Sequence, residues 1–137
     1  MNIKTHGNIS ERLVGKPIEV IGGTRATVEL TATEEMTADS TGLIHGGFTF
    51  GLADYAAMLA VNHPNVVLGS AQAKFTAPVK TGDTMRAEAT VTNVDGKKSE
   101  VNVEVKVGEL KVFTGIFLCY SLEKHVLEKS REKQLVG

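Results

Sequence analysis

The stretch GLIHGGFTFGLADYAAMLAV, residues 42–61, sets the architecture of the whole chain. Its apolar residues do not alternate with polar ones, and it follows a polar loop, so it predicts a helix over about residues 46–62. The helix is expected to stop before Pro64, because proline disfavours helical geometry in the residue before it. Helical spacing places Asp54 among small and apolar residues, where an unpaired charge is costly. Asp54 is therefore a candidate for function rather than for stability.

Most of the chain outside this helix alternates apolar and polar residues, which predicts β-strands. Strands are expected over residues 16–21, 25–33, 66–78, 84–93, 99–107 and 110–120. The last four are expected to form a meander, with Asp95-Gly96 as a two-residue hairpin turn. Small residues of strand 66–78 would pack on the helix, and strand 110–120 would be covered on both faces. The expected fold class is α+β, with the helix lying on a strongly curved antiparallel sheet.

Composition and charge limit the classes of protein to consider. The chain has 137 residues and a formal net charge of −1, without a basic stripe that would suit a phosphate backbone, so nucleic acid is not an expected partner. No apolar run has the length of a signal-peptide core or a membrane-spanning helix. We therefore expect a soluble, cytoplasmic protein that does not bind membranes. A single domain is expected over residues 1–137, with its core at about 17–121 and a charged tail at 122–137.

The histidines and the single cysteine show no metal-binding pattern. His6, His63 and His125 are scattered without ligand spacing, so no metal site is expected. Cys119 excludes an internal disulfide, and its apolar surroundings indicate a buried structural thiol.

Two motifs resemble those of a known family. His45-Gly46-Gly47, with Asp54 nine positions after the histidine in a Leu-Ala-Asp triplet, resembles the HGG...LAD signature of hotdog-fold acyl-CoA thioesterases of the phenylacetate-pathway type. Residues 74–85, KFTAPVKTGDTM, are similar to that family's strand that ends in a proline and a short turn. The resemblance covers about residues 18–120. It implies a hotdog fold, in which a curved antiparallel sheet wraps a long central helix.

The resemblance also implies a mechanism. In that family the amide after the HGG histidine, here Gly46 with Gly47 beside it, hydrogen-bonds the thioester carbonyl, and a helix N-terminus suits that task. The family's carboxylate, here Asp54, acts from the partner subunit as general base or nucleophile. His45 is expected to hold the loop more than to carry a proton. The implied assembly is a homodimer, with a homotetramer as the alternative, and coenzyme A enters only as part of the substrate.

Expectations for substrate binding are less direct. Four side chains of the helix are candidates for the acyl pocket: Phe48, Phe50, Tyr55 and Met58. The family's polar position on the strand after the helix aligns with Leu68, which leaves Ser70 or Gln72 as substitutes. Lys74 is a surface lysine by default, and a lysine on a sheet edge can also meet the phosphates of coenzyme A.

One acidic residue and two other functions stay open. Relatives often have asparagine where this chain has Asp39; a second acid beside Asp54 would raise a pKa or point elsewhere. Residues 9–16 and 101–121 also resemble the ligand-binding domain of a bacterial fatty-acid-synthesis repressor, a hotdog that senses malonyl-CoA, so binding of acyl-CoA without hydrolysis is the alternative. A hotdog hydratase expects an aspartate and a histidine a few residues apart, whereas Asp39 precedes His45 by six.

Overall fold

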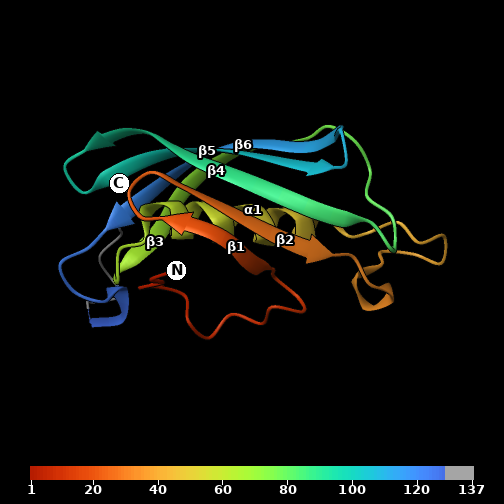
Figure 1. The fold of residues 1–137 in the computed structure, drawn as a ribbon, viewed down its shortest axis with the longest axis horizontal. Helices are drawn as coiled ribbons and strands as arrows, with labels where there is room; N and C mark the ends of the chain where they lie inside the picture. Colours follow the sequence, from red (N-terminus) through yellow and green to blue (C-terminus); the bar gives the residue numbers. More distant parts are fainter. Residues whose placement is uncertain (129–137) are drawn as a thin grey trace.

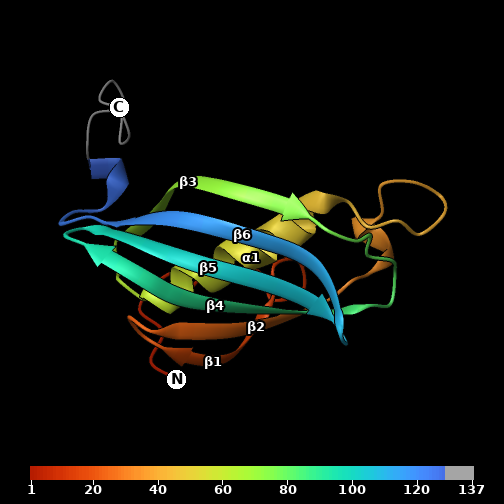
Figure 2. The same ribbon diagram turned by 90° about the horizontal axis from the view of Figure 1, so that it is seen from above.

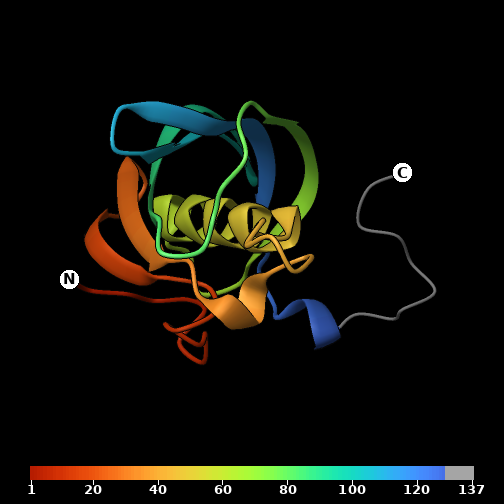
Figure 3. The same cartoon turned by 90° about the vertical axis from the view of Figure 1, so that its right-hand side faces the viewer.

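The computed structural model describes residues 1–128, and in it one six-stranded antiparallel sheet wraps around helix α1 (Figures 1 and 3). The strands are β1 (Lys16–Ile21), β2 (Arg25–Thr31), β3 (Val66–Phe75), β4 (Thr84–Asp95), β5 (Lys98–Val107) and β6 (Leu110–Ser121). The helical segments are α1 (Gly46–Val61) and the short turns η1 (Glu34–Met36) and η2 (Val126–Glu128). The expected α+β hotdog architecture is confirmed.

The order of the strands differs from the expected meander. The sheet runs β1-β2-β4-β5-β6-β3. Of the four strands expected in the meander, only β4, β5 and β6 are neighbours in sequence order, and β3 lies at an edge beside β6 (Figure 2). Residues 76–83 between β3 and β4 are too many for a tight hairpin. They cross the end of the sheet instead, because Ile44 N–H bonds the Val79 carbonyl and Ala32 N–H bonds the Asp83 carbonyl. The strand after the helix therefore becomes an edge strand.

A β-bulge near the start of β3 changes which side chains share a face. Leu68 lies opposite Cys119, and Ser70 lies opposite Leu118, so Gly69 is an extra residue. Val67 therefore lies on the other face from Ala71, and not on the same face as strict alternation predicted. The expected packing of small β3 residues on the helix is also wrong, because Ala71 and Ala73 are exposed at the edge.

Helix α1 is buried on nearly all sides, because an N-terminal segment covers the face that the sheet does not (Figures 1 and 3). Asn62 anchors this segment: its side-chain oxygen accepts the Lys4 N–H at 2.9 Å, and its amide donates to the Asn2 carbonyl at 2.8 Å. Asn62 is left-handed with φ of 55° and caps the helix, which is why α1 ends at Val61. Ile9, Leu13 and Val14 of the segment pack against the core.

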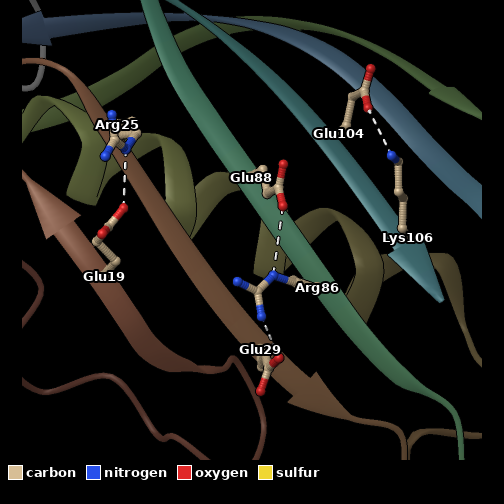
Figure 4. Close-up of polar contacts among 7 residues, drawn as sticks. All are labelled: Glu19, Arg25, Glu29, Arg86, Glu88, Glu104 and Lys106. Atoms are coloured by element: carbon tan, nitrogen blue, oxygen red, sulfur yellow. Dashed lines mark hydrogen bonds and ion pairs between the residues drawn. The ribbon is translucent and has the colours of Figure 1, made fainter. Parts of the chain in front are cut away.

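The outer face of the sheet is polar and charged. Arg25 pairs with Glu19, and Arg86 lies between Glu29 and Glu88 (Figure 4). On this face Ile116 of β6 is 40% exposed, so the expectation that this strand is covered on both faces is wrong for the single chain.

Three further expectations can be placed. The hairpin loop between β4 and β5 consists of Gly96 and Lys97, one residue later than expected, with the positive φ of 61° at Gly96. Among residues 1–128, no helix is long and apolar enough to cross a membrane. Of the expected C-terminal tail, η2 is described, whereas residues 129–137 lie outside the described part of the chain.

Candidate active site

The HGG sequence forms the N-terminus of α1. His45 is the N-cap residue, and its Nδ1 accepts a hydrogen bond from the Gly47 N–H at 2.8 Å. A Cβ on residue 47 would lie 2.8 Å from that nitrogen, so glycine is required for the imidazole to reach its place. His45 and Gly47 thus have structural tasks, and the Gly47 amide is already engaged.

The backbone N–H of Gly46, at the N-terminus of α1, has no hydrogen-bond acceptor among residues 1–128. By contrast, the Phe48 N–H bonds the His45 carbonyl at 3.1 Å. The ring of Phe75 lies over Gly46, where a Cβ would be 3.2 Å from the ring edge. A free N–H at the positive end of a helix dipole can stabilise a developing oxyanion. Glycine at position 46 lets both the aromatic ring and a substrate approach the backbone.

Asp54 lies in the middle of α1, near Cys119 of β6. One carboxylate oxygen is buried without a hydrogen-bond partner among residues 1–128. Burial without compensation raises the pKa of Asp54 to about 6. Burial, together with the charge of Asp54, raises the pKa of the Cys119 thiol to about 12, which agrees with the expected structural role of that cysteine. A carboxyl group tuned close to neutral pH is suited to accept a proton.

Gly46 and Asp54 are too far apart within one chain to act on one carbonyl. They are separated by eight residues of continuous helix, which is about 12 Å along the axis at 1.5 Å per residue. A base and an oxyanion donor must both lie near hydrogen-bonding distance of the reacting atoms. The two groups therefore belong to different sites, or to one site built from two chains.

A pocket of about 390 Å³ opens beside Gly46. It is lined by Ile44, Gly46, Thr49, Phe75, Thr76, Ala77, Pro78, Val79 and Val112. The segment after β3 forms one wall, because Thr76 N–H bonds the Val112 carbonyl at 2.9 Å. The pocket thus places apolar surface directly next to the free amide.

The structure separates the four predicted acyl-pocket residues. Phe50 is partly buried and packs on Phe113 and Phe117, with ring centroids 6.3 and 5.5 Å away. Phe48 lies at the helix start against His45. Met58 is 1% exposed in the core, and Tyr55 is 5% exposed beside His6 of the N-terminal segment. Met58 and Tyr55 are therefore packing residues and do not reach the pocket beside Gly46.

The predicted polar residues of β3 lie on the opposite face of the sheet. Ser70, Gln72 and Lys74 pair with the outward-facing Leu118, Ile116 and Thr114. Gln72 and Lys74 line a larger hollow of about 510 Å³ on that face. We place the site at the smaller pocket, because only that one contacts Gly46. Within one chain, these β3 side chains are not brought together with Gly46 or Asp54.

Asp39 is exposed and is not among the residues that line the pocket beside Gly46. Its Oδ1 accepts hydrogen bonds from the Thr41 N–H at 2.9 Å and the Thr41 hydroxyl at 2.6 Å. These bonds hold the pKa of Asp39 below its ordinary value. Asp39 therefore stabilises an exposed turn. Among residues 1–128, no group of three His, Cys, Asp or Glu residues is arranged to hold a metal ion.

Phe75 and the pocket wall formed by residues 76–79 do not stand out in the sequence, where Phe75 is one more apolar residue of a strand. The available signal was Pro78 in KFTAPV, because a proline ends strand pairing and frees the backbone to form a wall.

Comparison with known proteins agrees with this geometry. The family model described as thioesterase superfamily matches residues 41–114, which include α1, β3 and the pocket wall. The chain belongs to the thioesterase superfamily. Two solved structures support the hotdog fold of this superfamily member. An uncharacterized protein from Pyrococcus horikoshii has 55% identity and a TM-score of 0.90, covering 93% of this chain and 97% of that one. The phenylacetic acid degradation protein PaaI from Thermus thermophilus, solved as a mutant, has 27% identity and a TM-score of 0.74, covering 80% and 95%.

Two curated relatives are longer than this superfamily member. A protein named methylthioribose-1-phosphate isomerase from Aquifex aeolicus is 54% identical over 117 residues, which are 85% of this chain and 25% of that protein. Transcription factor FapR from Caldanaerobacter subterraneus is 32% identical over 129 residues, which are 94% of this chain and 64% of its own length. The chain thus spans less than two thirds of either relative, and their names describe those longer proteins.

Proposed function

We propose that this superfamily member is an acyl-CoA thioesterase whose active site is shared between two chains. The observation that carries the proposal is the pair of unsatisfied groups on α1: a free Gly46 amide and an Asp54 carboxylate without a partner. Each has the properties that thioester hydrolysis needs, and within one chain they are about 12 Å apart along the helix.

The amide of Gly46 supplies the oxyanion site. When water attacks the thioester carbon, the carbonyl oxygen gains negative charge, and the Gly46 N–H donates a hydrogen bond to it at the positive end of the helix dipole. Loss of a single such donor typically lowers the rate by about 100-fold or more.

Asp54 of the partner subunit supplies the base or the nucleophile. As a base, its carboxylate takes a proton from the attacking water, the tetrahedral intermediate collapses, and the C–S bond breaks. The proton held by Asp54 then passes to the departing thiolate, which gives a carboxylic acid and free coenzyme A. As a nucleophile, it attacks the thioester carbon and forms an anhydride as the C–S bond breaks, and the departing thiolate takes a proton from solvent. Water then hydrolyses the anhydride, which releases the carboxylic acid and restores the Asp54 carboxylate. Both routes need the ionised carboxylate, and its pKa of about 6 leaves it ionised at neutral pH.

Edge strand β3 is the surface that fits a second copy of the chain. It pairs with β6 on one side, and its other edge has no neighbouring strand in the described sheet (Figure 2). On its inner side Ala71, Ala73 and Phe75 are exposed. Antiparallel pairing of two β3 edges by a two-fold axis covers these side chains and sets the two α1 helices antiparallel. The N-terminus of each helix then faces the middle of the other, where Asp54 lies.

Binding of acyl-CoA without hydrolysis is the second candidate. It is favoured by the match to transcription factor FapR, which extends over 94% of this chain. Against it stands the uncompensated burial of Asp54, which a purely binding protein has no need to maintain.

A thiol-release assay across a panel of acyl-CoA thioesters tests the proposal. Hydrolysis by the parent chain, and its loss in Asp54→Asn, are the expected results. Saturable binding of acyl-CoA with no release of thiol by the parent would overturn the thioesterase assignment in favour of the second candidate.

A further inference from the structure

The pocket beside Gly46 has no charged side chain in its lining. Its nine lining residues are apolar except for two threonines. Its inner walls Ile44, Val79 and Val112 are almost completely buried. A group that enters the pocket beyond the reacting carbonyl therefore meets hydrocarbon.

The two hydroxyl groups in this pocket already donate hydrogen bonds within the protein. Thr49 Oγ1 donates to the Met85 sulfur at 3.4 Å, and Thr76 Oγ1 donates to the Lys111 carbonyl at 2.8 Å. Because a hydroxyl has a single hydrogen, each threonine can offer a ligand only acceptor lone pairs. Neither threonine can donate a hydrogen bond to an anion in the pocket.

The lysines close to this pocket in the sequence are directed elsewhere. The ammonium group of Lys111 pairs with Glu104 at 3.2 Å. Lys74 lies in the hollow on the outer face of the sheet. Lys80 lines a neighbouring hollow with Leu43 and Leu110 and is not among the residues that line the pocket beside Gly46. Among residues 1–128, no lysine or arginine therefore lines the pocket beside Gly46.

We propose, on the basis of the thioesterase function above, that this pocket takes a compact, uncharged acyl group and rejects acyl groups that end in a carboxylate. Such a carboxylate would leave water and gain neither a side-chain donor nor a cation, and the Gly46 amide is engaged by the thioester carbonyl. Asp54 of the partner subunit, which the shared site brings to the same carbonyl, adds a like charge. The volume of about 390 Å³ lies near the lower end for small-molecule pockets, which favours a compact group.

Butyryl-CoA and succinyl-CoA form a matched pair of probes, because both acyl groups have a four-carbon chain and succinyl adds one terminal carboxylate. We expect kcat/KM for butyryl-CoA to exceed that for succinyl-CoA by on the order of 100-fold or more, the scale of an unpaired buried anion. Similar kcat/KM values for the two thioesters would overturn this inference while supporting the thioesterase function.

A positively charged side chain introduced into the pocket wall tests whether this pocket causes the preference for butyryl-CoA over succinyl-CoA. The side chain of Thr76 is exposed and lines the pocket, so Thr76→Arg is not expected to prevent folding. We expect Thr76→Arg to raise kcat/KM for succinyl-CoA relative to butyryl-CoA by roughly tenfold. Thr76→Gln is the matched control, because it loses the same hydroxyl and adds a long polar chain without charge. An equal change in both variants would place the discrimination outside this pocket.

Direct binding separates this inference from the proposed function. If the parent releases thiol from neither probe, the thioesterase assignment fails, and the dissociation constants of the same two thioesters test the pocket by calorimetry. Tighter binding of butyryl-CoA supports the inference, and equal or tighter binding of succinyl-CoA overturns it.

Discussion

Nδ1 of His45 accepts a hydrogen bond from the backbone N–H of Gly47 at 2.8 Å. An imidazole nitrogen that accepts is not protonated, so a neutral ring carries its proton on Nε2. The contact caps the start of α1, whose first residue, Gly46, lines the pocket. In the proposed mechanism, His45 therefore holds the helix start without needing to exchange a proton.

Substitutions of His45 distinguish a role in capping the helix from a role in proton transfer. His45→Ala removes the side-chain acceptor and should lower the free energy of unfolding by about 1 kcal/mol, whereas asparagine is a good N-cap and His45→Asn should retain most of that stability. Denaturant unfolding measures both. We also expect His45→Asn to keep most of the parental kcat. If His45→Asn is as stable as the parent but has lost hydrolysis, His45 carries a proton and the capping account is incorrect.

The amide of Gly46 can be deleted without deleting the helix. Residue 46 is the first residue of α1, where proline is well tolerated, and His45 has ψ of 131°, which suits a residue before proline. We expect Gly46→Pro to lower kcat by about 100-fold or more, because the N–H is lost. Gly46→Ala is the matched control: it brings a Cβ to the same place near Phe75 but keeps the N–H. Equal losses in the two variants, measured by thiol release, would assign the effect to the Phe75 contact instead.

The pH dependence of hydrolysis should follow Asp54. Only the ionised carboxylate acts as base or nucleophile, so kcat/KM should rise with pH and level off above the pKa of about 6. Initial rates across a pH series measure this acidic limb. If the acidic limb of the pH–rate profile instead gave a pKa close to 3.8, the ordinary value for aspartate, Asp54 would be solvated in the active protein.

Asp54 also makes stability depend on pH. Its pKa is higher in the folded chain than in the unfolded one, so its contribution to stability is present below 3.8 and is lost as pH rises through about 6. Asp54→Asn should therefore exceed the parent in free energy of unfolding by roughly 2 to 3 kcal/mol at about pH 8. The difference should shrink toward zero at acidic pH. A variant that is less stable than the parent at alkaline pH would contradict the uncompensated burial of this carboxylate.

The helix and the places of its candidate residues, Gly46 and Asp54, could be predicted from the sequence because their signals are local. The HGG sequence, Pro64 and the position of Asp54 on an apolar stripe all act within one element, and the structure places α1 at Gly46–Val61 accordingly. The pairing of β3 could not be predicted in the same way. Whether a strand joins its successor or crosses to a distant partner depends on the loop between them, here residues 76–83, which bonds to residues 32 and 44.

The pocket beside Gly46 could not be predicted, because it is formed by packing between elements. Tyr55 and Met58 are candidates as large side chains of the helix, but the N-terminal segment and the core cover them. Phe75 reaches Gly46 from the end of an edge strand 29 positions away. The outward direction of Ser70 follows from a bulge that residue types alone do not locate.

Mixing two inactive chains tests the shared active site most directly. Asp54→Asn lacks the carboxylate and Gly46→Pro lacks the amide, so neither homodimer is expected to hydrolyse acyl-CoA. When the two chains are unfolded together and refolded in equal amounts, half of the dimers should be mixed, and one of the two sites in each should be complete. We therefore expect recovery of about a quarter of the parental activity, for random pairing in a two-fold dimer. Native mass spectrometry would confirm the mixed dimers, and no recovery of activity in their presence would contradict a site built from two chains.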